Sequence, residues 1–174
     1  RVYASVAGGL LGVVECSEDK EMVVSNCSVD TVSLIISSGG ESDGKVGVGG
    51  LVGDCSFSKI ESSFSSCVMK VGGSVPTGGI VGRAANSSVI NSGTKGEISV
   101  DASNTNGAYG GCIGVAVASE IRNVYSLMSV TGVNNVGGIV GNLESGAIMS
   151  NCYVSGKVSC NQGNNVNTVV GFIN

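Results

Sequence analysis

The chain contains no histidine, no tryptophan and a single proline, and only 4% of its 174 residues are aromatic. Histidine is the usual general base and the commonest metal ligand, so its absence excludes Ser/His/Asp and Cys/His nucleophilic sites within this chain. A globular core normally uses large aromatic side chains to fill its volume. Their scarcity therefore predicts a narrow interior filled by Val, Ile, Leu, Ala and Cys.

Charge is also sparse, and no basic surface is indicated. Nine basic residues are scattered along the chain and the net charge is −4, which argues against nucleic acid as a partner. No apolar run reaches the roughly 18 residues of a membrane span, so we expect no membrane insertion. No signal peptide is visible, and residue 1 is Arg rather than Met, so we expect a mature form or a segment of a longer protein.

Glycine is what the chain has in excess, with 29 residues. There is no Gly-X-Y period, which excludes collagen, and a mean hydropathy of +0.35 with 42% apolar residues excludes a disordered tail. The glycines form a recurring phrase, Gly-Gly-x-x-Gly, at intervals typical of a solenoid or array. Its five copies are residues 8–12, 49–53, 78–82, 110–114 and 137–141, and a degenerate sixth copy is residues 167–171.

A second phrase follows each glycine phrase, at a spacing of nine or ten residues in four of the five repeats. It places an amide or hydroxyl side chain at one shared position, occupied by Asn26, Ser62, Asn91, Asn123 and Asn151. Two residues upstream lie the apolar residues Val24, Ile60, Val89, Ile121 and Met149, and a third segment shares Met69, Ile98, Val130 and Val158 at one offset. Each repeat is therefore interpreted as two or three short strands separated by Gly, Asn and Ser turns.

These strands are too short to be stable alone, but stacking on neighbouring coils about 4.8 Å away would give each one hydrogen bonds above and below. The sequence thus predicts an all-β fold, a parallel β-solenoid (β-helix) of five to six right-handed coils in a single domain, residues 1–174. The expected coils are 8–48, 49–77, 78–109, 110–136 and 137–166, with a partial coil at 167–174. The Asn/Ser position would form a structural ladder, and the paired glycines would suit corners where a Cβ clashes or φ is positive.

The pairing of the glycine phrase with a later I-x-N-x-Y-like phrase resembles the GLUG-motif repeats, and the resemblance covers nearly the whole chain. Repeat one departs from the pattern with Ser28, and repeat three with Gly93, where an aromatic residue is usual. The resemblance implies a β-solenoid scaffold in a cell-surface or extracellular protein, often an adhesive one. It supplies no catalytic residues.

The acidic residues do not recur at one offset, so no stacked acidic wall of a polysaccharide-processing enzyme is expected. We therefore expect no enzyme, no catalytic residue and no bound cofactor. The acidic run Glu15–Glu21 could attract calcium, but it lacks Asp-x-Asp-x-Asp-Gly spacing, and a solvated charged loop without a metal is the preferred interpretation.

Seven cysteines form no CxxC or zinc pattern. Cys55 and Cys112 fall at positions where other repeats have apolar residues, which indicates small buried side chains. The alternative is a disulfide within one coil, either Cys16–Cys27 or Cys55–Cys67. Asn26 and Asn86 fit the N-glycosylation acceptor pattern, although such matches are common in a chain rich in Asn and Ser.

The function that these observations favour is structural or adhesive: a stiff segment of a cell-surface or extracellular protein. A solenoid needs capped ends, and none is visible, so the expected partners are other segments of the parent protein or other copies joined end to end into a fibre. The alternative is a module that binds host or matrix glycan or protein through the inter-coil loops Gly39–Val48 and Asp101–Tyr109. A polysaccharide-processing enzyme and an ice-binding solenoid are weaker alternatives, the latter because the threonines form no column.

Overall fold

The computed structural model describes residues 2–3, 6–37, 46–101, 107–161 and 163–174, and every regular element within these ranges is a β-strand. The strands form four parallel sheets, which we name A to D. No helix in the described ranges has the length and apolar character needed to cross a bilayer.

Sheets A and B contain the strands on either side of each predicted inter-coil loop. Sheet A consists of β1 (Val2–Tyr3), β5 (Ser28–Ser37), β9 (Phe64–Gly72), β13 (Gly93–Val100), β17 (Tyr125–Gly132), β21 (Tyr153–Val154) and β22 (Val158–Cys160). Sheet B consists of β2 (Val6–Gly8), β6 (Gly47–Gly49), β10 (Thr77–Gly78), β14 (Tyr109–Gly110), β18 (Val136–Gly137) and β23 (Val166–Asn167).

Sheets C and D follow the glycine phrase in each repeat. Sheet C consists of β3 (Leu11–Glu15), β7 (Val52–Ser56), β11 (Val81–Ala85), β15 (Ile113–Val117), β19 (Val140–Leu143) and β24 (Val170–Ile173). Sheet D consists of β4 (Met22–Ser25), β8 (Ser58–Glu61), β12 (Ser88–Ile90), β16 (Glu120–Arg122) and β20 (Ile148–Ser150).

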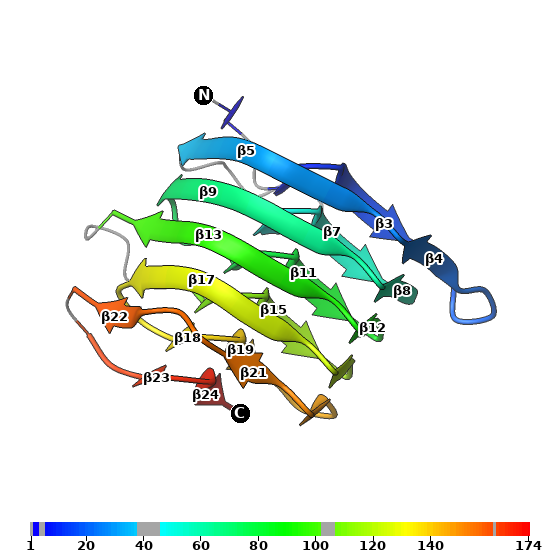
Figure 1. The fold of residues 1–174 in the computed structure, drawn as a ribbon. Helices are drawn as coiled ribbons and strands as arrows, with labels where there is room; N and C mark the ends of the chain where they lie inside the picture. Colours follow the sequence, from blue (N-terminus) through cyan, green and yellow to red (C-terminus); the bar gives the residue numbers. More distant parts are fainter. Residues whose placement is uncertain (1, 4–5, 38–45, 102–106, 162) are drawn as a thin grey trace.

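Each repeat contributes one strand to each sheet in the order B, C, D, A, and successive repeats stack in chain order, as the row β5, β9, β13 and β17 shows (Figure 1). The predicted all-β parallel solenoid is therefore confirmed. The structure forms about four turns, slightly fewer than predicted. In the fifth repeat the long strand of sheet A is divided into β21 and β22, and the sixth contributes only β23 and β24. The right-handed winding stays a prediction.

The apolar columns inferred from the repeat spacing lie in register. Val24, Ile60, Val89, Ile121 and Met149 pair along sheet D, while Met69, Ile98, Val130 and Val158 pair along sheet A. These columns belong to two apolar clusters. One contains the sheet D column with residues of sheet C such as Val52 and Ile113, and the other contains the sheet A column with residues of sheet B such as Val48 and Tyr109.

The glycine phrase joins sheet B to sheet C, and each of its three glycines is needed for a different contact. A Cβ on the first, such as Gly49, would overlap the carbonyl of Val52 in the same coil. A Cβ on the second, such as Gly50, would overlap the carbonyl of Gly79 in the next coil. A Cβ on the third, such as Gly82, would overlap sheet B backbone from the preceding coil, whereas at Gly12 in the first coil it would meet nothing within 4 Å. Among the described residues, the glycines with positive φ are Gly96, Gly146 and Gly163, so steric contact, not φ, explains the phrase.

Gly93, which departs from the family pattern, is covered by an aromatic ring from the next coil. Gly93 pairs with Tyr125 in sheet A, and a Cβ on Gly93 would overlap the Tyr125 ring. The Tyr125 ring thus lies over the Gly93 backbone and reaches Phe64, two coils before Tyr125, with ring centroids 6.4 Å apart. The side chain of Tyr125 therefore occupies the outer position of its own coil and also that of the coil containing Gly93, because Gly93 has no side chain of its own.

Candidate functional site

The corner between sheets D and A carries a column of left-handed residues. Asn26, Ser62, Asn91, Asn123 and Asn151, which the sequence assigned to a structural ladder, all lie on this corner with φ between 49° and 54°. Asn tolerates this conformation better than most residues because its short polar side chain can bond locally. The Asn123 side-chain amide donates to Asn91 Oδ1 at 2.8 Å, and the Asn151 amide donates to Asn123 Oδ1 at 3.3 Å. The last three rungs thus share an exposed chain of amide hydrogen bonds.

A second column, of buried hydroxyl groups, follows this corner on the inside and was missed in the sequence. Ser63 Oγ donates to the Glu61 carbonyl and accepts the N–H of Cys27 in the preceding coil. Ser92 Oγ repeats the pattern with Ile90 and with the N–H of Ser63. Each hydroxyl therefore links two coils. It accepts a hydrogen bond from a backbone N–H at the corner of the preceding coil and so supplies that donor with a partner.

The corner between sheets C and D repeats this construction. Its left-handed residues are Phe57, Asn86 and Ala118, and the serines that follow them, Ser58, Ser87 and Ser119, are buried. Ser87 Oγ accepts the N–H of Ser58, and Ser119 Oγ accepts the N–H of Ser87. A recurring polar pair ending in Ser, such as Asn86-Ser87 and Asn91-Ser92, is the sequence signal that could have predicted both corners.

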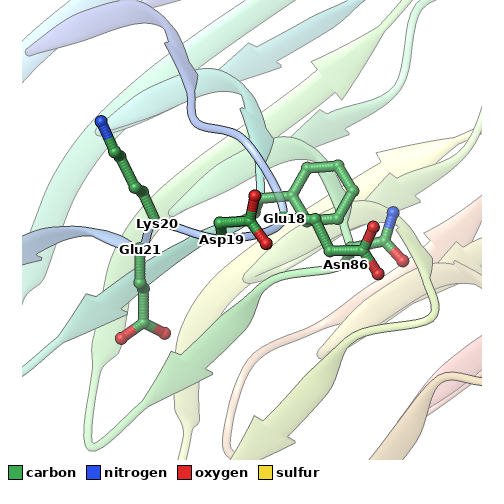
Figure 2. Close-up of a pocket in the computed structure, with 6 residues that line it drawn as sticks. Glu18, Asp19, Lys20, Glu21 and Asn86 are labelled. Atoms are coloured by element: carbon green, nitrogen blue, oxygen red, sulfur yellow. The ribbon is translucent and has the colours of Figure 1, made fainter.

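The acidic run lies beside the corner between sheets C and D. Glu18, Asp19, Lys20 and Glu21 are exposed, and together with Phe57 and Asn86 they line a shallow depression of about 280 Å³. The Lys20 and Glu21 side chains point in opposite directions (Figure 2). Within the ranges that the structure describes, no three His, Cys, Asp or Glu side chains converge on a metal-binding position. The charged side chains of this run are thus exposed to solvent, and the absence of a metal there stays a prediction.

All seven cysteines are free, so neither Cys16–Cys27 nor Cys55–Cys67 is a disulfide in the structure. Cys55 and Cys67 belong to different apolar clusters, which explains why they do not pair. Cys27 and Cys152 occupy the position of the corner serines, and each thiol donates to the carbonyl two residues upstream at 3.3 Å. The sequence-based disulfide alternative is therefore wrong for this structure.

The remaining sequence-based candidates are placed as follows. Asn26 and Asn86 are both exposed, and their glycosylation stays a prediction. Most of the two inter-coil loops proposed for ligand binding, Gly39–Val48 and Asp101–Tyr109, lies outside the described residues, which omit 38–45 and 102–106. Of the described ends of these loops, Val48 and Tyr109 are buried in the core, whereas Asp101 is exposed.

Two substitutions of Asn123 should distinguish the contribution of its amide hydrogen bonds to stability from the contribution of its left-handed backbone conformation. Asn123→Ala is expected to lower the free energy of unfolding by about 2 kcal/mol, because it removes the exposed amide bonds and the short polar side chain that lets Asn tolerate the left-handed region, which Ala tolerates less well. Asn123→Gly removes the same bonds but tolerates the backbone, so it should cost about 0.5 kcal/mol. Urea denaturation of both variants measures the difference. Equal losses would show that φ at Asn123 is not a constraint.

Alkaline pH should weaken the fold through two buried groups. Burial raises the pKa of the Cys112 thiol from 9.0 to about 12, and burial raises the pKa of Tyr109 from 10.0 to about 12. The unfolded chain loses these protons first, so stability is retained below pH 9 and falls between pH 9 and 12. Urea denaturation at a series of pH values should show this decline, and it should be shallower in a Cys112→Ala/Tyr109→Phe variant. A flat profile for the unsubstituted chain would contradict the assignment.

One coil of this solenoid matches a known family model. The matched stretch, residues 132–159, runs from the end of β17 through β18, β19, β20 and β21 into β22, and so contains one glycine phrase and one corner with Asn151. Residues 132–159 are a GLUG motif. No curated protein and no solved structure matches the chain. The GLUG motif confirms the resemblance drawn from the sequence, and together with the stacked sheets it fits a structural repeat segment.

Proposed function

We propose that this GLUG-containing solenoid is a stiff structural segment of a cell-surface or extracellular protein. The observation that carries the proposal is the continuous stacking of its strands. In the coils with neighbours on both sides, strands of all four sheets pair in parallel with the coil before and the coil after, so bending would break several hydrogen-bonded ladders at once. The paired strands therefore hold the outer faces of the solenoid at fixed positions. A structural role of this kind does not require histidine, which the chain lacks.

The terminal coils support a further step, the addition of another solenoid coil at each end. Leu11 is 37% exposed at the first coil, whereas its in-register partners Val52, Val81, Ile113 and Val140 are 0% exposed. At the other end Phe172 and Ile173 of β24 are also exposed. Open strand edges flanked by apolar side chains recruit further strands. The fitting partners are further coils of the same protein or another copy of this chain, joined end to end.

Two measurements test the proposal. Antibodies raised against the described coils should label intact cells of the source or its extracellular material, and labelling that requires permeabilised cells would contradict the surface location. Sedimentation of the isolated chain tests end-to-end growth, which should increase with concentration and give elongated particles. A compact monomer at all concentrations would exclude fibre assembly while leaving the spacer role standing.

Adhesion through the inter-coil loops is a second candidate function, favoured by the resemblance to adhesin-type repeats. Replacing residues 39–45 and 102–106 with short Gly/Ser linkers should then abolish binding to host or matrix material without unfolding the coils. Polysaccharide processing is the weakest candidate, and product analysis after incubation with polysaccharides tests it.

A further inference from the structure

We infer that the outer face of sheet A is a binding platform for an uncharged, linear glycan, a role that goes beyond the proposed structural function. The inference starts from where apolar side chains reach solvent. In the coils stacked on both sides, and among the residues that the structure describes, the exposed large apolar side chains are Val68, Tyr125 and Leu127. All three lie on the outer face of sheet A, in β9 and β17.

Along the edge of this face where the strands β9, β13, β17 and β21 begin, a column that contains three aromatic residues follows the axis of the stack. Phe64, Gly93, Tyr125 and Tyr153 are in register in four successive coils. The Tyr125 ring lies over the Gly93 backbone, and 39% of the residue remains exposed to solvent. Tyr153 extends the column and is 61% exposed. We call Phe64, Tyr125 and Tyr153 the aromatic strip.

A strip of flat rings presents the chemistry that sugar rings bind. The face of an aromatic ring carries partial negative charge, and it attracts the weakly positive C–H groups on the less polar face of a pyranose. The strip runs along consecutive coils about 4.8 Å apart. A linear chain of sugars lying along the stack could therefore contact one ring after another.

Polar side chains flank the strip on both sides. On one side, two residues before the strip, are the exposed amides of Asn91, Asn123 and Asn151. Each amide retains a second N–H and a second lone pair beyond the bonds of the ladder. On the other side, two residues after Gly93, is the exposed Lys95. Two residues of strand span about 7 Å, so Lys95 can reach the edge of a sugar bound on the rings. The amides lie on the other side, at the corner that immediately precedes the strip.

The charges around the strip favour an uncharged glycan. Lys95 and Glu97 are both exposed on β13 and have opposite sign. On the adjoining strands of sheet D, Lys59 pairs with Glu61 at 2.6 Å and Arg122 pairs with Glu120 at 3.0 Å. The same face also carries exposed Lys70 on β9, exposed Lys157 between β21 and β22, and exposed Asp30 on β5. Its charges therefore nearly cancel, with one positive charge in excess, which gives a sulfated or uronic-acid polymer little advantage over an uncharged one.

The same residues argue against a second copy of the chain as the occupant. Two sheets packed face to face lie about 10 Å apart and exclude water between them. Such packing would bury Lys95 and Glu97 in the middle of the interface, where the loss of hydration costs several kcal/mol per unpaired charge. A glycan one sugar wide covers the aromatic strip and leaves both charges hydrated at its edge.

Calorimetric titration of the full chain with soluble cello-oligosaccharides and chito-oligosaccharides tests the inference, with heparin and polygalacturonate as charged comparisons. At least one uncharged oligosaccharide should bind, and Tyr125→Ala should weaken that binding about tenfold. Tyr153→Ala should also weaken it, and because Tyr153 is more exposed this variant should fold even if Tyr125→Ala does not. Lys70→Ala, which removes an exposed side chain of β9 away from the strip, and Ile173→Ala, which removes an exposed apolar side chain of sheet C, should bind as the unsubstituted chain does.

Any of the following results would overturn the inference. Absence of binding to every uncharged probe, or tighter binding of the charged polymers, would exclude an uncharged glycan as the occupant. Binding that survives both tyrosine substitutions would place the site elsewhere, such as in the inter-coil loops. Sedimentation of the same variants tests whether a second copy of the chain is the occupant. Self-association that Tyr153→Ala abolishes would show that a second copy covers the outer face of sheet A. None of these results affects the proposed structural role.

Discussion

Gly82→Ala is expected to prevent the solenoid from folding, or to lower its free energy of unfolding by about 4 kcal/mol or more. Gly82 is the third glycine of its phrase, in β11 of sheet C. A Cβ at this position would overlap backbone atoms of Gly47 and Val48, which belong to β6 of sheet B in the preceding coil. The added methyl group therefore forces two strands apart.

The size of the effect follows from what the methyl group meets. An oversized side chain in a core usually costs about 1–3 kcal/mol, because neighbouring side chains can change rotamer. Backbone atoms held in two hydrogen-bonded ladders cannot move in this way. Displacing β6 would also disturb its pairing with β2 and β10.

Gly12→Ala provides the matched control, because Gly12 is the third glycine of the first phrase. A Cβ on Gly12 would meet nothing within 4 Å, and the residue is exposed in β3. We expect its free energy of unfolding to stay within about 0.5 kcal/mol of the unsubstituted chain. Thermal and urea denaturation of the two variants measure the contrast. Equal stability of the Gly82 and Gly12 variants would contradict the close packing of sheet B on sheet C.

These two glycines show how far the sequence could predict the fold. The glycine phrase predicted a corner in every coil, and the spacing of Val24, Ile60 and their counterparts predicted apolar columns that lie in register. The sequence could not distinguish a corner that needs positive φ from one that needs an absent Cβ. That distinction depends on the coil before and the coil after, which meet only when the chain is stacked.

The candidate sites were less predictable for a similar reason. Ser63 and Ser87 look like ordinary turn residues, and their role as bridges between coils depends on a backbone N–H supplied by another repeat. Gly93 was recognised only as a departure from the aromatic pattern. The ring that covers it comes from Tyr125, 32 positions later, so the aromatic strip becomes visible only when the rungs are aligned.

Tyr109→Ala is expected to lower the free energy of unfolding by about 3–5 kcal/mol, the range for removing a large buried aromatic side chain. Tyr109 begins β14 of sheet B, and none of its surface is exposed. Its ring is enclosed by backbone, since a Cβ on Gly107 or Gly132 would overlap it. The equivalent positions in neighbouring coils hold the smaller residues Thr77 and Val136, so no adjacent side chain is large enough to fill the vacated volume.

Tyr109→Phe separates the contribution of the ring from that of the hydroxyl group. Within the described part of the chain, the Tyr109 hydroxyl oxygen has no hydrogen-bond partner. Removing a buried hydroxyl without a partner also removes its desolvation cost, so the phenylalanine variant should be as stable as the unsubstituted chain or more stable by up to about 1 kcal/mol. Urea denaturation of the two variants at neutral pH gives both values. A loss in Tyr109→Phe comparable to that in Tyr109→Ala would mean that the hydroxyl is hydrogen-bonded in solution, and that this rung is held by a polar contact as well as by the volume of the ring.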